Sequence, residues 1–300
     1  MRIVSLGEAM LELRGGASGC TLGFGGDTLN TAIHLSRYGR SVSYATALGH
    51  DPFSEEMKAA WQQEGIDTSA VLTDPERRPG LYAIRTDAAG ERRFYYWREH
   101  SAARRLHSLA DSAWVQRVIG QADVLYYSLI SLAILPPEGR EWLFQCCRAV
   151  RERGGRVAFD GNYRPALWAS PAEAGRWRDR ALACADYGLP TLADEQMIDP
   201  SWTAETVMAH WAASGVRETV VKLGAEGCLL AQGIVVAPEP VPRPVDTSGA
   251  GDAFNAGYLH GRLSGAEPLG AARSGHALAG WVIQRAGAIP ARDPGYTYDG

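Results

Sequence analysis

Short apolar runs alternate with segments of helical spacing along most of this chain, and no other feature of the sequence constrains its fold as strongly. The runs typical of buried strands lie at residues 3–6, 42–48, 123–128, 156–160 and 219–223. The segments of helical spacing lie near 28–38, 52–64, 137–152, 171–184 and 203–214. Strands that alternate with helices favour a parallel sheet with helices on both faces. We therefore expect an α/β fold with a mostly parallel central sheet, whose ligands bind beyond the carboxyl ends of the strands.

Local signals mark where two of these helices begin and end. Asp27 or Thr28 is expected to cap a helix that stops at Gly39. The Asp-Pro pair at 51–52 is expected to start another, because aspartate caps helix N-termini and proline suits the first helical position. Each helix then follows one of the predicted strands, as the alternation requires.

A β-hairpin interrupts the alternation. Two stretches rich in strand-forming residues, 80–86 and 92–98, flank a turn predicted at 87–90. Their tyrosines and arginines suit a small sheet with one face over a cleft. Arg92 and Arg93 are expected to lie in solvent, since charged side chains are common on exposed edge strands.

Composition excludes several classes of protein. The chain has 300 residues, of which 46% are hydrophobic and 21% charged, as in ordinary globular proteins, and we expect residues 1–300 to form one domain. A net charge of −4 argues against a nucleic-acid or anionic membrane partner. Five cysteines without a Cys-x-x-Cys pair indicate reduced thiols in the cytoplasm. The first residues are interpreted as a strand rather than a signal peptide, and no apolar run approaches the length of a membrane helix.

The segment 245–254 (VDTSGAGDAF) carries the strongest chemical signal. Its glycines let the backbone turn sharply and approach a ligand closely, and the segment opens a predicted helix. The N–H groups of Gly249, Ala250 and Gly251 then point outward, where the helix dipole favours negative charge. Asp252 beside this anion site is interpreted as a general base that takes a proton from a hydroxyl while the amides stabilise a phosphoryl group. A glycine-rich loop with an ordinary surface aspartate is the alternative.

Other enzyme classes lack their signatures in this chain. There is no P-loop, and the Gly-Ala-Gly run lacks the third glycine of dinucleotide-binding proteins. Cysteines and histidines with zinc-ligand spacing are absent from the sequence. The sequence therefore does not favour a P-loop enzyme, a dinucleotide-binding protein or a zinc enzyme.

Two widely separated motifs resemble those of the ribokinase-like (PfkB-type) sugar kinases. The segment 245–254 is similar to the family's C-terminal signature, and GFGGDTLN at 23–30 is similar to its substrate-binding element. The resemblance implies a three-layer α/β/α fold with a small β-lid, contributed largely by residues 80–98, and ATP and Mg²⁺ as cofactors. It also implies that Asp252 is the catalytic base. Sugar contacts are implied for Gly25, Gly26, Asp27, Asn30 and Asp252.

Further blocks, at 7–13, 80–82, 96–98 and 159–165, resemble the 2-keto-3-deoxygluconate kinases in particular. The resemblance implies transfer of the ATP γ-phosphoryl to the terminal 6-hydroxyl of 2-keto-3-deoxy-D-gluconate, giving 2-keto-3-deoxy-6-phosphogluconate. Residues implied to contact this sugar acid are Gly26, Tyr82, Tyr96, Arg98 and Arg164.

The two arginines give this substrate a physical basis. A sugar acid needs a cation for its carboxylate, and arginine offers a planar fork that matches one. Arg98 ends the hairpin and Arg164 follows the strand at 156–160, so both are expected at the cleft. A surface ion pair is the alternative for Arg164. For the whole chain, a kinase for a neutral hexose such as fructose and a catalytically silent sugar-acid-binding regulator are the alternatives. We expect a homo-oligomer.

The nucleotide is expected along residues 220–227, a strand that runs into a glycine turn and resembles the family segment beside the phosphates and ribose. Two alternatives to nucleotide binding stay open. Lys222 is then a solvated lysine at a strand end, and His276 only packs its helix against its neighbours. The residues implied to bind the nucleotide are Asn162, Lys222, Gly224, Ala225, Gly227, Gly249, Gly251 and His276.

The metal site departs from the family pattern. The family carries an Asn-x-x-Glu motif linked to Mg²⁺ and phosphate, and the matching stretch here is Leu-Ala-Asp-Glu at 192–195. Glu195 is expected to organise Mg²⁺ through water, since Mg²⁺ keeps much of its hydration shell. Whether Asp194 compensates for the missing asparagine stays open.

Overall fold

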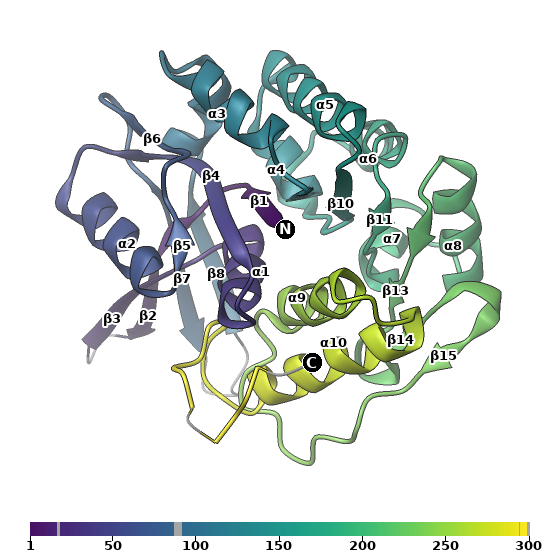
Figure 1. Cartoon of the computed structure of the whole chain (residues 1–300). Coiled ribbons are helices and arrows are strands. Elements are labelled where there is room, and N and C mark those ends of the chain that lie inside the picture. Colours follow the sequence, from purple (N-terminus) through teal and green to yellow (C-terminus); the bar gives the residue numbers. More distant parts are fainter. Residues whose placement is uncertain (17–18, 87–91, 294, 299–300) are drawn as a thin grey trace.

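The central sheet of this computed structural model consists of parallel strands (Figure 1). The structure describes residues 1–300 except 17–18, 87–91, 294 and 299–300. Within the described residues the sheet has eight strands, in the order β12 (Glu218–Thr219), β11 (Tyr187–Gly188), β10 (Arg156–Asp160), β9 (Val124–Ser128), β1 (Arg2–Leu6), β4 (Ser41–Gly49) and β5 (Ile66–Asp67), with β6 (Val71–Asp74) also paired to β4. These pairings are parallel, as the alternation predicts.

Helices cover both faces of the central sheet, because the side chains of each strand alternate between two apolar cores. Val4 and Leu6 of β1 point into one core and Ile3 into the other. The first core is closed by α3 (Ser112–Gly120), α4 (Leu129–Ile134), α5 (Pro137–Glu152), α6 (Pro171–Leu182), α7 (Leu192–Ile198) and α8 (Ala204–Ala213). The second is closed by α1 (Asp27–Arg37), α2 (Pro52–Gln63), α9 (Ala250–Leu263) and α10 (Pro268–Ile283). This is the predicted three-layer α/β/α arrangement.

Other helical features are minor. Short 3₁₀ helices lie at Ala102–Ser108, Pro165–Leu167, Gly224–Glu226 and Ala231–Gly233. In the part of the chain that the structure describes, no helix combines the length and the apolar character needed to cross a membrane.

The expected cap is present at α2 but not at α1. Asp51 caps α2 through its side chain. α1 begins after Gly26 and has no side-chain cap, so the prediction of a cap at Asp27 or Thr28 was wrong. Both residues lie inside the first turn of the helix, and the Asp27 carboxylate accepts a hydrogen bond from the distant Asn162 instead.

A separate four-stranded sheet stands beside the central one (Figure 1). It contains β3 (Gly19–Gly25), β2 (Met10–Gly16), β7 (Gly80–Thr86) and β8 (Arg92–Trp97), in that order. β7 and β8 form the predicted antiparallel hairpin, and its turn, predicted at 87–90, lies outside the described residues. Arg93 is exposed on the edge strand as expected, whereas the side chain of Arg92 is also outside the described part. β2 and β3 were not predicted from the sequence, and they join the hairpin through a parallel pairing of β2 with β7.

The strand predicted at 219–223 is divided between two sheets. Its first part, β12, joins the central sheet, and its second part, β13 (Val221–Lys222), begins a small antiparallel sheet with β14 (Cys228–Leu229) and β15 (Val235–Val236). Gly224 and Gly227, with φ of 64° and 104°, reverse the chain between β13 and β14. The apolar run continues through this change of partner, so a single strand was predicted.

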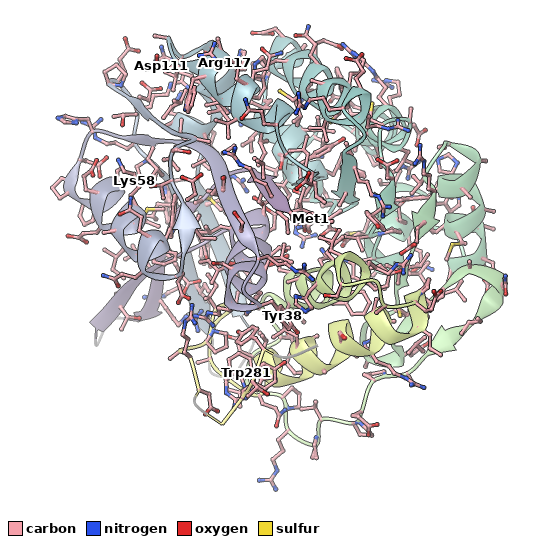
Figure 2. The ribbon with its side chains drawn as sticks, viewed as in Figure 1. Met1, Tyr38, Lys58, Asp111, Arg117 and Trp281 are labelled. Carbon is pink, nitrogen blue, oxygen red and sulfur yellow. The ribbon has the colours of Figure 1, made fainter. Side chains whose placement is uncertain are left out.

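Aromatic side chains tie the C-terminal segment to α1 and α10. Tyr296 stacks on Trp281 with ring centroids 4.5 Å apart, and Tyr298 lies edge-on to Tyr38 at 5.0 Å. Figure 2 shows Tyr38 and Trp281 on the same side of the molecule. This packing closes the second core beneath the end of the chain.

Candidate active site

One large cleft lies between the carboxyl-end edge of the central sheet, the four-stranded sheet and the start of α9. Its volume is 1240 Å³, above the roughly 300–1,000 Å³ of a single small-molecule pocket, which suits two substrates. The cleft lies where parallel α/β sheets bind their ligands. It brings together every predicted site residue except Gly25 and Glu195, which do not line it.

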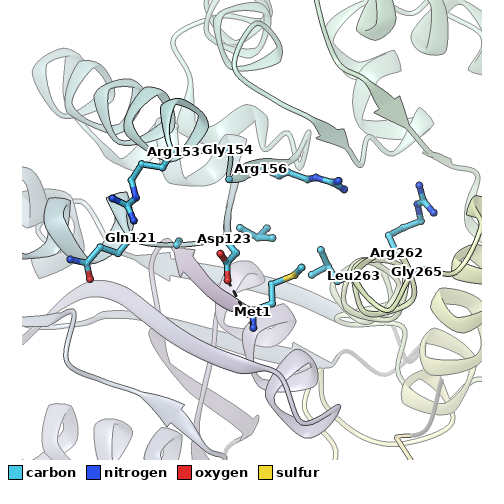
Figure 3. Close-up of a pocket in the computed structure, with 12 residues that line it drawn as sticks. Met1, Gln121, Asp123, Arg153, Gly154, Arg156, Arg262, Leu263 and Gly265 are labelled. Carbon is cyan, nitrogen blue, oxygen red and sulfur yellow. Dashed lines mark ion pairs between the residues drawn. The ribbon is translucent and has the colours of Figure 1, made fainter.

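A smaller hollow of 390 Å³ lies at the opposite end of the central strands and is lined by Met1, Asp123 and several arginines (Figure 3). Two of these arginines are already engaged. Arg262 makes a two-pronged ion pair with Glu218 at 2.7 Å, and Arg156 donates to the Tyr187 hydroxyl. Because this hollow lies at the amino ends of the strands, the large cleft is the candidate active site.

The glycine turn, residues 247–251, leads into α9 at one wall of the cleft. Gly249 has a left-handed conformation, with φ of 73°, and a Cβ there would collide with Ala288. Ala250, one of the three predicted amide donors, donates to the Thr247 carbonyl at 3.3 Å. The N–H groups of Gly249 and Gly251 have no backbone acceptor among the described residues. The turn therefore offers an anion site at the positive end of a helix.

Asp252 lies in the first turn of α9 and lines the cleft. Its Oδ2 accepts a hydrogen bond from Asn30 Nδ2 at 2.7 Å. Burial, together with the negative charges of Asp27 and Asp160, raises the pKa of Asp252 to about 8, even though Asn30 and Lys222 oppose the shift. A carboxyl with this pKa is well suited to accept a proton near neutral pH.

Asp27 belongs to the same group of neighbouring carboxylates as Asp252. Its Oδ2 accepts from Asn162 Nδ2 at 2.9 Å, which links α1 to the loop after β10. Burial raises the pKa of Asp27, while hydrogen bonds from Ser128 and Asn162 oppose the shift. Asn162, predicted on the nucleotide side, thus lies against the predicted sugar-binding element.

Tyrosines from the hairpin form the opposite wall of the cleft. Tyr82 and Tyr96 face each other across β7 and β8, with ring centroids 5.9 Å apart. The Tyr82 hydroxyl donates to Glu12 Oε2 at 2.5 Å. A Cβ on Gly25 would collide with this hydroxyl, so Gly25 lies behind Tyr82 and acts by making room for it. Glu12 was missed by the sequence analysis, because only the pairing of β2 with β7 brings it opposite Tyr82.

Arg98 is buried and already holds a carboxylate. Its Nη2 donates to Oε2 of Glu8, a buried residue that the sequence analysis did not single out. Each of these two residues also has a buried polar atom that makes no hydrogen bond to the described residues. These atoms are Arg98 Nε and Glu8 Oε1. Both residues line the cleft. The pair therefore offers a donor and an acceptor together, rather than a free cation.

Arg164 is the more open of the two arginines. Its side chain is 47% exposed and pairs with Asp194 at 3.3 Å, and its Nη1 also donates to the Tyr163 carbonyl at 2.6 Å. The nearby negative charges of Asp194, Asp27 and others outweigh the effect of burial and raise the pKa of Arg164, so the guanidinium stays charged. A partly exposed arginine at the mouth of a cleft remains able to bind an incoming carboxylate.

Lys222 is a buried cation in the floor of the cleft, not the solvated lysine of the alternative interpretation. Its Nζ donates to Asp160 Oδ1 at 3.2 Å and to Asn255 Oδ1 at 3.0 Å. Nearby, Gly224, Ala225 and Gly227 line the cleft along the reversal after β13. A Cβ on Gly227 would collide with the Val236 carbonyl, so only glycine permits this close approach.

His276, implied by the resemblance to bind the nucleotide, lies on α10. Its Nε2 lies 2.9 Å from the Val236 carbonyl, so this nitrogen carries the proton and donates it. The ring packs against Phe254 with centroids 4.9 Å apart. Burial lowers the pKa of His276 and keeps the ring neutral. His276 therefore both packs between elements and lines the cleft.

Glu195 lies behind the cleft instead of in it. It is fully buried and forms an ion pair with Arg178 at 2.5 Å, and burial raises its pKa to about 7. Its neighbour Asp194 does line the cleft. No group of three metal-binding side chains occurs in the described part of the chain. Proteins commonly bind Mg²⁺ through one or two carboxylates together with substrate phosphates and water. Asp194 fits that kind of site, whereas a site made of protein side chains alone would need more carboxylates than lie here among the described residues.

The model of the pfkB family carbohydrate kinases matches residues 2–294. This chain belongs to the PfkB family of carbohydrate kinases. The PfkB chain is 43% identical to the 2-dehydro-3-deoxygluconokinase of Escherichia coli K12, over 97% of the chain and 98% of that protein. It is also 43% identical to the 2-dehydro-3-deoxygluconokinase of Dickeya dadantii, over 96% of both proteins. A fructokinase of Salmonella typhimurium is 30% identical over 85% of the chain and 82% of that protein.

Solved structures share the fold of this PfkB kinase. A 2-dehydro-3-deoxygluconokinase from Thermotoga maritima has a TM-score of 0.86 at 19% identity, covering 97% of this chain and 96% of that one. Fructokinase from Vibrio cholerae, in a form with bound fructose, ADP and calcium, has a TM-score of 0.82 at 27% identity, covering 96% and 94%. The predicted ribokinase-like α/β fold is thus confirmed, and the protein is an enzyme of the carbohydrate kinase class.

Proposed function

We propose that this enzyme transfers the γ-phosphoryl of ATP to the terminal 6-hydroxyl of 2-keto-3-deoxy-D-gluconate, giving 2-keto-3-deoxy-6-phosphogluconate. The observation that carries the proposal is a single cleft with Asp252 at the glycine turn and the arginines Arg98 and Arg164 also on its walls. A base, an anion site and cations for a carboxylate are the groups that phosphorylation of a sugar acid requires. The 43% identity to 2-dehydro-3-deoxygluconokinases supports the same substrate.

In the proposed reaction, Asp252 takes the proton of the sugar hydroxyl as that oxygen attacks the phosphoryl group. Asn30 holds Oδ2 of this carboxylate, so its other oxygen stays available for the hydroxyl. The N–H groups of Gly249 and Gly251, at the positive end of α9, stabilise the charge of the transferring group. Asp194 would hold Mg²⁺ together with the nucleotide, and the bound ion would neutralise charge on the triphosphate.

Two sides of the cleft would recognise the sugar: one binds its hydroxyls and the other its carboxylate. Gly26, Asp27 and Asn30 on α1 and its approach offer groups for the hydroxyls. Arg164 offers a guanidinium to the carboxylate, and the Arg98–Glu8 pair offers Nε as donor and Oε1 as acceptor. The nucleotide would lie along Gly224, Ala225, Gly227 and His276.

Two alternatives follow from particular observations. Because Glu8 already engages Arg98, a neutral hexose such as fructose remains the second candidate substrate. A silent sugar-acid-binding regulator is opposed by Asp252, Lys222 and the glycine turn lying in one cleft.

A substrate panel tests the proposal. ADP release with ATP and Mg²⁺ is measured for 2-keto-3-deoxygluconate, its galactonate epimer, fructose and ribose. We expect kcat/KM to be highest for a 2-keto-3-deoxy sugar acid. A higher kcat/KM for fructose supports the hexose kinase, and saturable sugar-acid binding without ADP release supports the regulator.

The proposal includes a cytoplasmic homo-oligomer of one domain, in which the four-stranded sheet acts as a lid. In the part of the chain that the structure describes, the cysteines form no disulfide. Tyr95 and Trp97 on β8 are 47% and 57% exposed and alternate with the residues that face the cleft, so a second copy would cover them on the outer face. Analytical ultracentrifugation of wild type and a Trp97→Ser variant tests this; a monomeric wild type would contradict it.

A further inference from the structure

Lys222 is held by two acceptors beneath the glycine turn. Only 7% of its surface is exposed, and its ammonium donates to Asp160 Oδ1 and Asn255 Oδ1. A Cβ on Gly251 would lie 3.7 Å from Lys222 Nζ, so the ammonium lies beside the first turn of α9. An ammonium has three N–H donors, which leaves one for a ligand in the cleft.

Asn255 forms hydrogen bonds with both Lys222 and Asp160. It lies on α9, one helical turn after Asp252, and is fully buried without lining the cleft. Its Oδ1 accepts from Lys222, while its Nδ2 donates to Asp160 Oδ2 at 2.8 Å and to the Tyr126 hydroxyl at 3.0 Å. The Lys222–Asn255–Asp160 cluster therefore depends on one neutral amide with a donor and an acceptor.

We infer that Asn255 is a positioning residue for the nucleotide phosphates, acting through the ammonium of Lys222. This inference rests on the proposed kinase function. A lysine side chain has four flexible carbons and holds a fixed position only when its donors are engaged. With Asn255 in place, the ammonium remains between Asp160 and the glycine turn, where the remaining N–H meets a phosphate oxygen. Without it, Lys222 retains only Asp160 and loses its fixed direction.

Asn255 is also the member of the cluster whose replacement is easiest to interpret. Replacing Asp160 changes the charge of the cleft floor, and this changes phosphate binding and the proton affinity of Asp252 together. Replacing Asn255 changes no charge. An effect on nucleotide binding then reports the position of Lys222 rather than the local field.

The test is calorimetric titration with ADP as the probe, first on the wild type and then on Asn255→Leu. We expect the ADP Kd to rise about tenfold, equivalent to about 1.4 kcal/mol, while the KM for the sugar stays within twofold of the wild type. Tyr258→Phe is the matched control, because Tyr258 lies on the same helix, is buried and donates one hydrogen bond to Glu218, away from the cleft. Asn255→Ala, which adds no bulk, serves if the leucine variant does not fold.

A double-mutant cycle with Lys222→Met separates positioning from general damage. We expect Asn255→Leu to have no further effect on the ADP Kd once Lys222 is replaced. An unchanged Kd in Asn255→Leu, an equal rise in Tyr258→Phe, or a full effect in the Lys222→Met background would each overturn the inference. A wild type that binds no nucleotide would instead refute the proposed kinase function.

Discussion

Among single residues, Asp252 most directly links the structure to the chemistry. Burial raises its pKa to about 8, and Asp27 and Asp160 contribute through their negative charges. With this pKa, Asp252 is protonated in most enzyme molecules at pH 7, so the proposed base is ionised in only a minor fraction of them. Activity is therefore expected to depend on the carboxylates around Asp252 as well as on Asp252 itself.

Replacing Asp252 with asparagine tests its role as the base. The variant keeps the size of the side chain and a hydrogen-bonding oxygen but cannot accept the proton. General base catalysis contributes about 10²–10⁴-fold, so kcat should fall by at least that order with little change in sugar affinity, measured by calorimetry. A variant with nearly full kcat would remove Asp252 from the mechanism.

The pH profile tests the environment of Asp252. Because the base must be unprotonated, kcat/KM should increase as the pH rises through about 8. Asp27→Asn removes a neighbouring negative charge and lowers the pKa of Asp252, so the midpoint should move to lower pH. Asp186→Asn is the control, since Asp186 is a buried aspartate that does not line the cleft and bonds the Val157 amide. Equal midpoints in wild type and Asp27→Asn would contradict the account.

Specificity for a sugar acid is tested at Arg164. Arg164→Lys retains the charge but loses the planar two-pronged geometry. Charge-assisted hydrogen bonds contribute roughly 1.5–3 kcal/mol, so kcat/KM for the sugar acid should fall about ten- to a hundredfold. Activity with fructose, measured in parallel, should change much less. Equal proportional losses for both sugars would show that Arg164 does not recognise the carboxylate. Arg98 is the less direct probe, because its replacement also leaves the buried Glu8 unpaired.

Residues inside contiguous motifs could be predicted from the sequence, and their partners could not. Asp252 and the glycine turn occur within one short segment, so their shared place at the start of a helix is visible locally in the sequence. Glu8 and Glu12 gain their roles from Arg98 and Tyr82, which lie 90 and 70 residues away in the chain. Neither contact leaves a periodic or spaced signal in the sequence.

At the scale of elements, the strong periodicity of the sequence predicted the central strands. It did not predict where the chain leaves one sheet and pairs with strands of another. β2 and β3 were missed because glycines interrupt their alternation of apolar and polar residues. β12 and β13 were merged because one apolar run serves two sheets. The cap of α1 was misassigned because Asp27 binds the distant Asn162.

The proposed lid predicts a change in hydrogen exchange. If the four-stranded sheet closes over the cleft, bound sugar acid should order it and exclude water from the reaction. Amide exchange measured by mass spectrometry should then slow in β7 and β8 when 2-keto-3-deoxygluconate is added. The buried strands β1 and β9 serve as the internal control. Equal exchange in the hairpin with and without the sugar would contradict a moving lid.

For the whole molecule, the alternation of strands and helices was sufficient to predict a three-layer fold with its site at the carboxyl ends of the strands. It was not sufficient to predict the strand order, because side-chain periodicity does not say which strands are neighbours. In the structure, that order places β1, β9 and β10 side by side. The loops after these strands and the start of α9 consequently meet at one cleft, where sugar and nucleotide would face each other.

The most direct test of the central claim is the identity of the product. The purified enzyme is incubated with ATP, Mg²⁺ and 2-keto-3-deoxygluconate, and the product is examined by ³¹P NMR with coupling to protons. We expect ADP and one phosphate monoester whose phosphorus couples to the two protons on carbon 6. No ADP release with the sugar acid, or a phosphate on another oxygen, would contradict it.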